Sequence, residues 1–194
     1  MCITTDSRTR MLEAAEQLFR VQGLHATGLA EVLDLSGAPR GSLYHYFPGG
    51  KEQLAVETLG QASDRIRDAL ERLLATGSAP DALRAYSDVA CRRLQRTDFA
   101  EGCPVGNTAL EASVGSSAVR DACDHAFRDW EAVIAERLAR DGIEPSEAAR
   151  LATFIVATFE GALLVARARR DTEPIVQAGD QLAAIVENAL PSGD

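Results

Sequence analysis

The segment between residues 27 and 51 constrains the fold of this 194-residue chain more than any other part of it. A favoured N-cap residue, Thr27, precedes apolar residues at helical spacing, which predicts a short amphipathic helix. Gly37 is expected to end this helix, because glycine accepts the positive φ that a tight turn between helices requires. Pro39 lies near the start of a second helix, where its missing N–H leaves no hydrogen bond unmade. The pattern predicts a helix-turn-helix.

The second helix of this motif is predicted to have a buried side and an outer side. Leu43 and Phe47 lie four residues apart, so both are expected to pack inward on the first helix, while polar residues remain outside. Thr27 and Lys51 are expected at helix N-termini, where free backbone N–H groups and the helix dipole favour a phosphate. The alternative is a solvated surface for Arg40 and Lys51, with the tyrosines in the core. The residues expected to contact DNA bases or phosphates are Thr27, Arg40, Ser42, Tyr44, His45 and Lys51.

The motif resembles the N-terminal domain of the TetR family of bacterial transcriptional regulators, through SGAPRGSLYHYFPGGKEQL at residues 36–54. Two further motifs are GCPVGN at residues 102–107 and EGALLVARAR at residues 160–169. Both are similar to the subgroup that includes drug- and flavonoid-responsive repressors of multidrug-efflux genes. The chain departs from the common family pattern at Leu33, where a small residue is usual, and at Pro39, where Ser or Thr is usual.

The resemblance implies a homodimer that binds a pseudo-palindromic operator in double-stranded DNA, represses transcription and is released by a small apolar or aromatic ligand. Two recognition helices related by a two-fold axis would meet successive major grooves, with half-sites about one turn apart.

The rest of the sequence predicts an all-α protein of about nine helices, because helix-forming residues dominate and aromatic residues are few. Residues 1–50 are expected to form the helix-turn-helix DNA-binding domain, and residues 51–194 a ligand-binding and dimerisation domain. The helix predicted at residues 51–75 would connect the two. Residues 97–107 are expected to be irregular, since Gly102, Pro104 and Gly106 oppose a long helix. Other helices are predicted at about residues 7–22, 81–95, 117–140, 146–169 and 173–190.

The net charge of −9 argues against a protein that coats nucleic acid without specificity. The first 60 residues carry five basic and seven acidic side chains, so DNA binding would depend on a local patch. Arg8, Arg10, Arg40 and Lys51 are expected to form it. We expect a cytoplasmic protein, since no secretory signal is recognised. The apolar run at residues 151–166 is shorter than the ~20 residues that span a bilayer, so a buried helix is expected rather than a membrane partner.

Cysteine and histidine residues show no spacing typical of a metal site or a catalytic centre. We therefore expect free thiols, no metal, no cofactor and no enzymatic activity. A thiol-based redox-sensing regulator that uses Cys91, Cys103 or Cys123 is the alternative, and a helical-bundle enzyme is less favoured. The fourth thiol is Cys2.

The helix predicted at residues 146–169 is apolar over most of its circumference and must be covered on both sides. The body of one chain would cover one side, and a partner chain, together with the last helix, the other. A central helix in a monomer is the alternative. Glu160 is expected to pair at this interface or with Arg167. The expected interface residues are Ile155, Phe159, Ala162, Leu163, Ala166, Leu182, Ile185, Val186 and Ala189.

A ligand pocket is expected where large apolar side chains gather with a few polar groups. A flat or apolar organic molecule bound there would move the connecting helix and change the separation of the two recognition helices. The alternative for each of these residues is that it packs in the apolar core and contacts no ligand. The expected ligand-binding residues are Tyr86, Phe99, Cys103, Asn107, Phe127, Trp130, Phe154 and Phe159.

Overall fold

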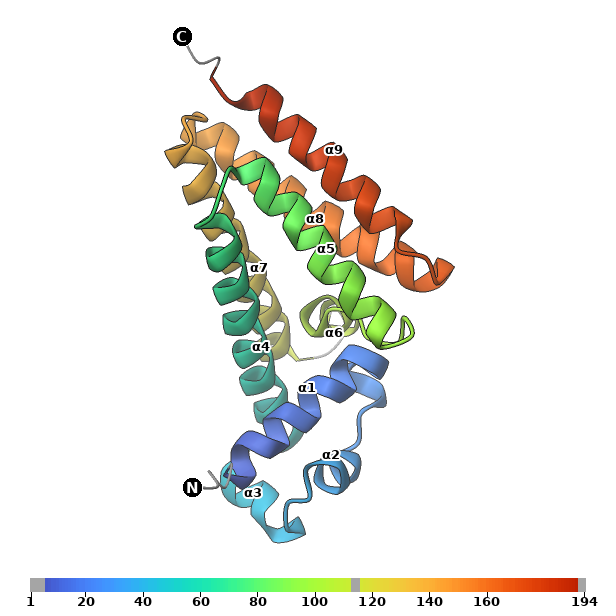
Figure 1. The fold of residues 1–194 in the computed structure, drawn as a ribbon. Coiled ribbons are helices and arrows are strands. Elements are labelled where there is room, and N and C mark those ends of the chain that lie inside the picture. Colours follow the sequence, from blue (N-terminus) through green and yellow to red (C-terminus); the bar gives the residue numbers. More distant parts are fainter. Residues whose placement is uncertain (1–5, 113–115, 192–194) are drawn as a thin grey trace, which may run out of the picture. The chain divides into compact units, whose positions relative to one another are not determined.

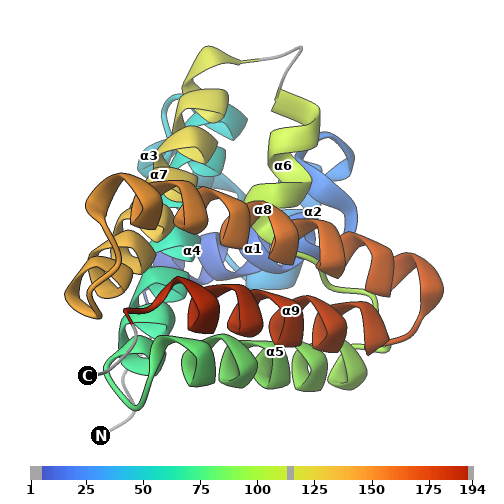
Figure 2. The ribbon, with the colours of Figure 1, turned by 90° about the horizontal axis from the view of Figure 1, so that it is seen from above.

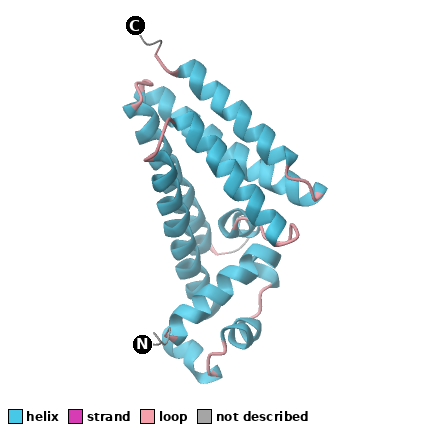
Figure 3. Ribbon diagram, in the orientation of Figure 1, coloured by secondary structure: helices cyan, strands magenta, loops and turns pink. Residues whose placement is uncertain are grey.

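The computed structural model describes residues 6–112 and 116–191, and Figures 1 and 3 show helices and loops throughout these residues. The prediction of an all-α fold is confirmed. Cys2 lies outside the described residues. The described helices are α1 Ser7–Ala26, α2 Leu29–Ser36, a 3-10 turn Arg40–Ser42, α3 Leu43–Tyr46, α4 Gly50–Leu74, α5 Ala79–Arg96, α6 Pro104–Ala112, α7 Ser117–Arg140, α8 Pro145–Arg169 and α9 Glu173–Ala189.

The helices form two compact units. The described residues of 1–63 and 103–126 make up the first unit, and those of 64–102 and 127–194 make up the second. Helices α4 and α7 each contribute residues to both units. The first unit therefore contains the helix-turn-helix segment together with α6, although α6 follows it by more than fifty residues in the sequence.

In the first unit, α1 packs against α2 and α6. Val32 of α2 is fully buried, and so are Leu43 and Phe47, which confirms the predicted inner side of the motif. Gly37 adopts the left-handed conformation, with φ of 62°, and ends α2 as expected. The prediction that Thr27 is the N-cap of α2 is wrong by one residue, because Gly28 occupies that position.

In the second unit, α5 and α8 both pack against α9, and Figure 2 shows these three helices side by side. Leu83 of α5, Ile155 of α8 and Leu182 of α9 belong to one buried apolar cluster. A smaller cluster forms around Leu94 and Ile175. The apolar residues on these helices recur at three- and four-residue spacing, which places them on one side of each helix.

Helix α6 begins earlier than the sequence predicts. Irregular structure was expected up to Asn107, but the helix starts at Pro104. The prediction is wrong because proline at the first helical position gives up an N–H that has no partner within a helix. The carbonyl of Cys103 accepts a hydrogen bond from the backbone N–H of Asn107 at 2.9 Å, which closes the first turn.

Helix α8 is long and apolar enough to cross a membrane by length and composition alone. Ala148, Ala152 and Ile155 on this helix are buried in the protein. Part of the apolar surface of α8 therefore belongs to the core of the helical protein.

Candidate DNA-contacting surface and ligand cavity

The outer side of the helix-turn-helix is built from the 3-10 turn and α3. Arg40, Tyr44 and His45 are exposed, and 66% of Tyr44 is accessible to solvent. Leu43 and Phe47 anchor the same short segment in the core, so it presents these polar side chains from a fixed backbone. This segment carries four of the six expected contact residues; three of them are exposed, and Ser42 is half-buried.

Ser42, Thr27 and Lys51 are engaged within the protein. The hydroxyl of Ser42 donates to the carbonyl of Pro39 at 2.6 Å. Thr27 is only 2% exposed, and its hydroxyl donates to the carbonyl of Gly23 at 2.6 Å. The backbone N–H of Thr27 is also engaged, since it donates to a carbonyl of α1 at 3.2 Å. Lys51, half-buried, donates from Nζ to the carbonyl of His25 at 3.3 Å.

Tyr46 links the motif to the beginning of α1. Its hydroxyl donates to Oδ1 of Asp6 at 3.2 Å. Because this hydrogen bond and the negative charge of Asp6 favour the protonated phenol, the pKa of Tyr46 is raised above its usual value. The rings of His45 and Tyr46 meet edge to face, with centroids 5.0 Å apart. Tyr46 thus contacts both Asp6 and the exposed ring of His45.

Two arginines of the first unit, Arg8 and Arg20, pair with glutamates of the same unit. Arg8 pairs with Glu57 and lies over the ring of Phe47 at 5.7 Å. Arg20 is buried beside Glu16. The ion pair with Glu57 offsets part of the charge of Arg8, whose side chain is still 41% exposed. Arg40 is an exposed cation of residues 40–46, which we call the recognition segment.

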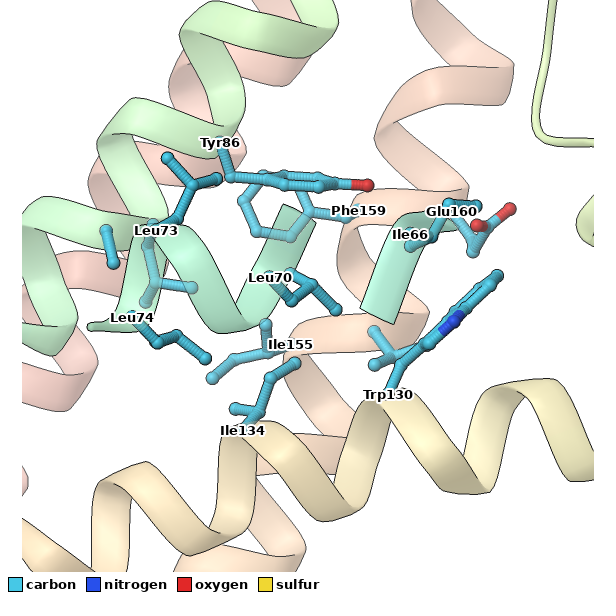
Figure 4. Close-up of a pocket in the computed structure, with 13 residues that line it drawn as sticks. Ile66, Leu70, Leu73, Leu74, Tyr86, Trp130, Ile134, Ile155, Phe159 and Glu160 are labelled. Atoms are coloured by element: carbon cyan, nitrogen blue, oxygen red, sulfur yellow. The ribbon is translucent and has the colours of Figure 1, made fainter. Parts of the chain in front are cut away.

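The second unit contains an apolar cavity of about 490 Å³, including its open mouth (Figure 4). Tyr86 and Phe159 meet edge to face inside it, with ring centroids 4.9 Å apart. Glu160 is the only charged residue of the lining. The rest of the lining is aliphatic or aromatic, so the cavity wall is apolar with few polar groups. Its lining residues are Ile66, Leu70, Leu73, Leu74, Ala82, Leu83, Tyr86, Trp130, Ile134, Ile155, Val156, Phe159 and Glu160.

Three of the eight expected ligand residues line this cavity, namely Tyr86, Trp130 and Phe159. Phe127 does not line the cavity, but its ring contacts that of the lining residue Trp130, with centroids 5.5 Å apart. Phe154 points to solvent and is 50% exposed.

The other three expected ligand residues lie elsewhere. Phe99 packs in the smaller cluster, under the guanidinium of Arg170 at 5.8 Å. Cys103 is buried in the first unit, and Asn107 donates hydrogen bonds to backbone carbonyls of α1. The aliphatic lining of the cavity was missed as a ligand site. The apolar residues 66, 70 and 73 of α4 have the spacing of one helix side, which indicates that they face inward. This spacing alone does not tell whether they line a cavity or pack in a filled core.

The exposed apolar surface of α8 and α9 differs from the expected interface. Five of the expected residues lie in the interior of the protomer, where they face its own core: Ile155, Ala162, Ala166, Leu182 and Val186. Phe159 lines the cavity, and Leu163 and Ala189 are partly buried against the apolar clusters. Ile185 is exposed. The other large apolar residues that these helices expose are Phe154, Leu164, Val165 and Val176.

The three described cysteines are free thiols. Burial raises the pKa of the Cys123 thiol to about 11. Burial, with a smaller effect from the charge of Asp88, also raises the pKa of Cys91. A raised pKa disfavours the thiolate, which is the reactive form. In the described part of the chain, no three His, Cys, Asp or Glu side chains are grouped so that they could hold a metal.

Two family models match this chain. Residues 11–58 match the bacterial regulatory proteins of the tetR family, and residues 79–181 match the C-terminal domain of LmrA/YxaF-like transcriptional regulators. The first match includes the whole helix-turn-helix segment, and the second includes most of the cavity lining.

Relatives and solved structures agree with these matches. The chain is 35% identical to the HTH-type transcriptional regulator YxaF of Bacillus subtilis over 182 residues, which cover 93% of this chain and 95% of YxaF. It is 36% identical to the HTH-type transcriptional regulator LmrA of the same organism, over 88% of this chain and 92% of LmrA. The crystal structure of reduced Escherichia coli NemR superposes with a TM-score of 0.79 at 28% identity, over 96% of this chain and 98% of NemR.

Proposed function

The chain belongs to the TetR family of bacterial regulatory proteins and is a helix-turn-helix transcriptional regulator, and we propose that it works in the cytoplasm as a ligand-responsive repressor. In this proposal a homodimer binds a pseudo-palindromic operator and leaves it when a small organic molecule binds. The exposed segment that carries Arg40, Tyr44 and His45 is the observation on which the proposal mainly depends.

We assign the DNA contacts by side-chain chemistry. Arg40 would meet a guanine edge or a phosphate, His45 a base edge or phosphate, and Tyr44 a phosphate oxygen. Ser42 would contact DNA after its hydroxyl turns away from Pro39, and Lys51 would leave the carbonyl of His25 for a phosphate. Of the six proposed DNA contacts, that of Thr27 has the least support, since its hydroxyl and its backbone N–H both donate hydrogen bonds within the protein.

We propose that α8 and α9 form the dimer interface through their exposed apolar residues. Members of this family act as dimers. Phe154, Gly161, Leu164 and Val165 lie on the solvent-facing side of α8, and a side chain added at Gly161 would meet open space. A small residue in the middle of an apolar stripe lets a second helix approach closely. A partner copy would cover this surface by the two-fold contact typical of homodimers.

The cavity of the second unit is our proposed ligand site. An apolar or aromatic molecule would fill it, and the Tyr86 hydroxyl and the Glu160 carboxylate would orient the ligand's polar groups. We extend the proposal to the subgroup of drug-responsive repressors of efflux genes because such a cavity suits flat organic molecules.

The cavity is connected to the DNA-binding residues along a single helix. Ile66, Leu70 and Leu73 of α4 line the cavity, and Lys51 lies in the first turn of the same helix. A ligand releases DNA only if it binds the DNA-incompetent state more tightly than the competent one. We place the functional division of the chain at residues 50 and 51, with residues 51–75 as the connection, although α6 belongs to the same compact unit as the helix-turn-helix.

Selection of bound sequences from a random pool of DNA duplexes tests the proposed function directly. A pseudo-palindrome with half-sites about one helical turn apart is the expected result. A pool with no enriched sequence, or with one isolated half-site bound by a monomer, would contradict it.

A thiol-based regulator is less supported, since the pKa values of Cys91 and Cys123 are raised. An all-cysteine-to-serine variant that keeps its DNA and ligand responses would dismiss it.

A further inference from the structure

Helix α1 is interrupted three residues before its end. Gly23 has φ of 79° and ψ of 179°, so the backbone leaves the helical path there and resumes it in the following residues. A break of this kind separates backbone groups around it from their i→i+4 partners, and buried groups of this type need other partners. We call residues 23–27, which join this break to α2, the kink junction.

Helix α6 supplies partners on both sides of the break. The side-chain amide of Asn107 donates to the carbonyls of Phe19 and Arg20, at 3.0 and 2.9 Å. The carboxylate of Glu111 accepts the backbone N–H of His25 at 2.7 Å. Asn107 and Glu111 lie four residues apart, on one side of α6, so the helix satisfies carbonyls before the break and an N–H after it.

The backbone conformation at position 23 favours glycine. Its positive φ is unfavourable for any residue with a Cβ atom. In addition, a Cβ added there would collide with the carboxylate of Glu111. The Glu111 carboxylate therefore lies in the space that a side chain at position 23 would occupy, and it would have to move if one were added.

The kink junction also holds the helix-turn-helix. The Thr27 hydroxyl donates to the carbonyl of Gly23 at 2.6 Å, and the next residue, Gly28, is the N-cap of α2. Lys51, at the start of α4, donates to the carbonyl of His25 at 3.3 Å. The beginning of α2 is thus fastened to the same short segment that Asn107 and Glu111 hold, and Lys51 contacts this segment in the protein without DNA.

We propose that Asn107 and Glu111 are positioning residues for operator binding. They act through the kink junction, which sets where α2 starts relative to α1 and hence where α3 presents its exposed side chains. This inference rests on the proposed function as a DNA-binding regulator. It gives Asn107 a role away from the ligand and assigns a role to Glu111, which no motif marked.

Two substitutions at one position separate a hydrogen bond from a charge. Glu111→Ala removes the acceptor for His25, whereas Glu111→Gln removes the charge and keeps an oxygen at the same place. Glu13→Ala is the matched control, since Glu13 is an exposed glutamate of α1. Hydrogen exchange of a peptide that covers residues 20–28 reports on the junction without DNA. Affinity for the duplex that the wild-type protein selects reports on positioning, and circular dichroism identifies any variant that does not fold.

We expect Glu111→Ala to exchange faster at residues 23–27 and to bind the duplex about tenfold more weakly, while Glu111→Gln and Glu13→Ala stay close to wild type. Equal weakening by Glu111→Ala and Glu111→Gln would overturn the proposal in favour of a charge effect. Wild-type affinity in folded Glu111→Ala would also overturn it. If Glu111→Ala does not fold, Asn107→Ala takes its place with the same expected results. Failure of the wild-type protein to select any duplex would instead count against the proposed function, and the exchange measurement would still test the junction.

Discussion

Arg40 is the residue whose replacement best tests specific recognition. It is exposed in the first turn of the recognition segment, where a guanidinium can make two hydrogen bonds to a guanine edge. Arg40→Ala is expected to weaken binding to the selected duplex by ~1–3 kcal/mol, with a much smaller loss on random duplexes. Titration by fluorescence anisotropy measures both. Arg92→Ala, which removes an exposed arginine of α5, is the control for charge alone. Equal losses on both duplexes would reassign Arg40 to a phosphate.

Lys51 is predicted to act through charge rather than through base recognition. Its ammonium lies at the first turn of α4, where backbone N–H groups also favour a phosphate. Lys51→Ala should flatten the slope of log affinity against log salt concentration by about one for each subunit. The reason is that DNA binding releases about one fewer counterion for each phosphate contact that is lost. Binding measured between low and moderate salt gives this slope. An unchanged slope would remove Lys51 from the DNA contacts.

Cys123 should make stability depend on pH in the alkaline range. Its pKa is about 11 in the folded protein and near 9.0 when unperturbed, so the unfolded chain loses this proton first. The buried, protonated thiol therefore stabilises the folded state fully below pH 9. As the pH rises towards 11, this contribution is lost, and the free energy of unfolding falls by about 2 kcal/mol. Urea unfolding of the wild type and of Cys123→Ala at pH 8 and pH 10.5 measures it. The variant should lose less stability over this interval; a parallel loss would contradict the shifted pKa.

At the scale of helices, apolar spacing predicted the long elements well and the short ones less well. The range predicted for α7 agrees with the structure, since apolar residues recur along its whole length. The early start of α6 at Pro104 and the continuation of α1 beyond Gly23 were not predicted. The continuation of α1 depends on partners distant in sequence, because α6 supplies the groups that satisfy the backbone around the break. The start of α6 is instead a local feature, since proline is favoured at the first helical position.

Contacts between residues distant in sequence also decide which parts of the candidate sites could be predicted. The exposed recognition residues could be predicted, because burial of Leu43 and Phe47 fixes the outer side of so short a helix. The exposed side of α8 could not be predicted, since apolar residues surround the helix and its sequence does not say which stripe meets its own core. The engagement of Thr27 with Gly23 was hidden for a similar reason, because it follows from the kink in α1.

The exposed apolar side of α8 gives a prediction about assembly. Val165 is 38% exposed on that side, and Val89 is 46% exposed on α5. Val165→Asp should raise the dimer dissociation constant about a hundredfold or more, because an unpaired carboxylate would be buried in the interface. Val89→Asp is the matched control and should leave the dimer intact. Sedimentation velocity over a range of concentrations measures both constants. A Val165→Asp protein that stays dimeric would move the interface elsewhere.

At the scale of the whole molecule, a cavity and a DNA surface form a switch only if their ligands oppose each other. Linkage requires the effect to be reciprocal: a molecule that lowers operator affinity by some factor must itself bind more weakly, by the same factor, when the operator is bound. A neutral apolar dye such as N-phenyl-1-naphthylamine can test this before the natural ligand is known. Its fluorescence rises in apolar cavities, and Trp130 in the cavity wall offers a second signal.

We expect the dye to bind the free protein more tightly than the operator complex, and to weaken operator binding by the same factor. Val156→Trp should abolish both effects while operator binding without dye persists, because a large ring would fill a cavity that Val156 lines. Val89→Trp places the same ring on an exposed part of α5 and should preserve both effects. If the dye binds the free and operator-bound protein equally, occupation of the cavity cannot shift the equilibrium, however tightly the dye is held. The cavity would then be a packing defect near α4, and the signal that releases DNA would have to act elsewhere.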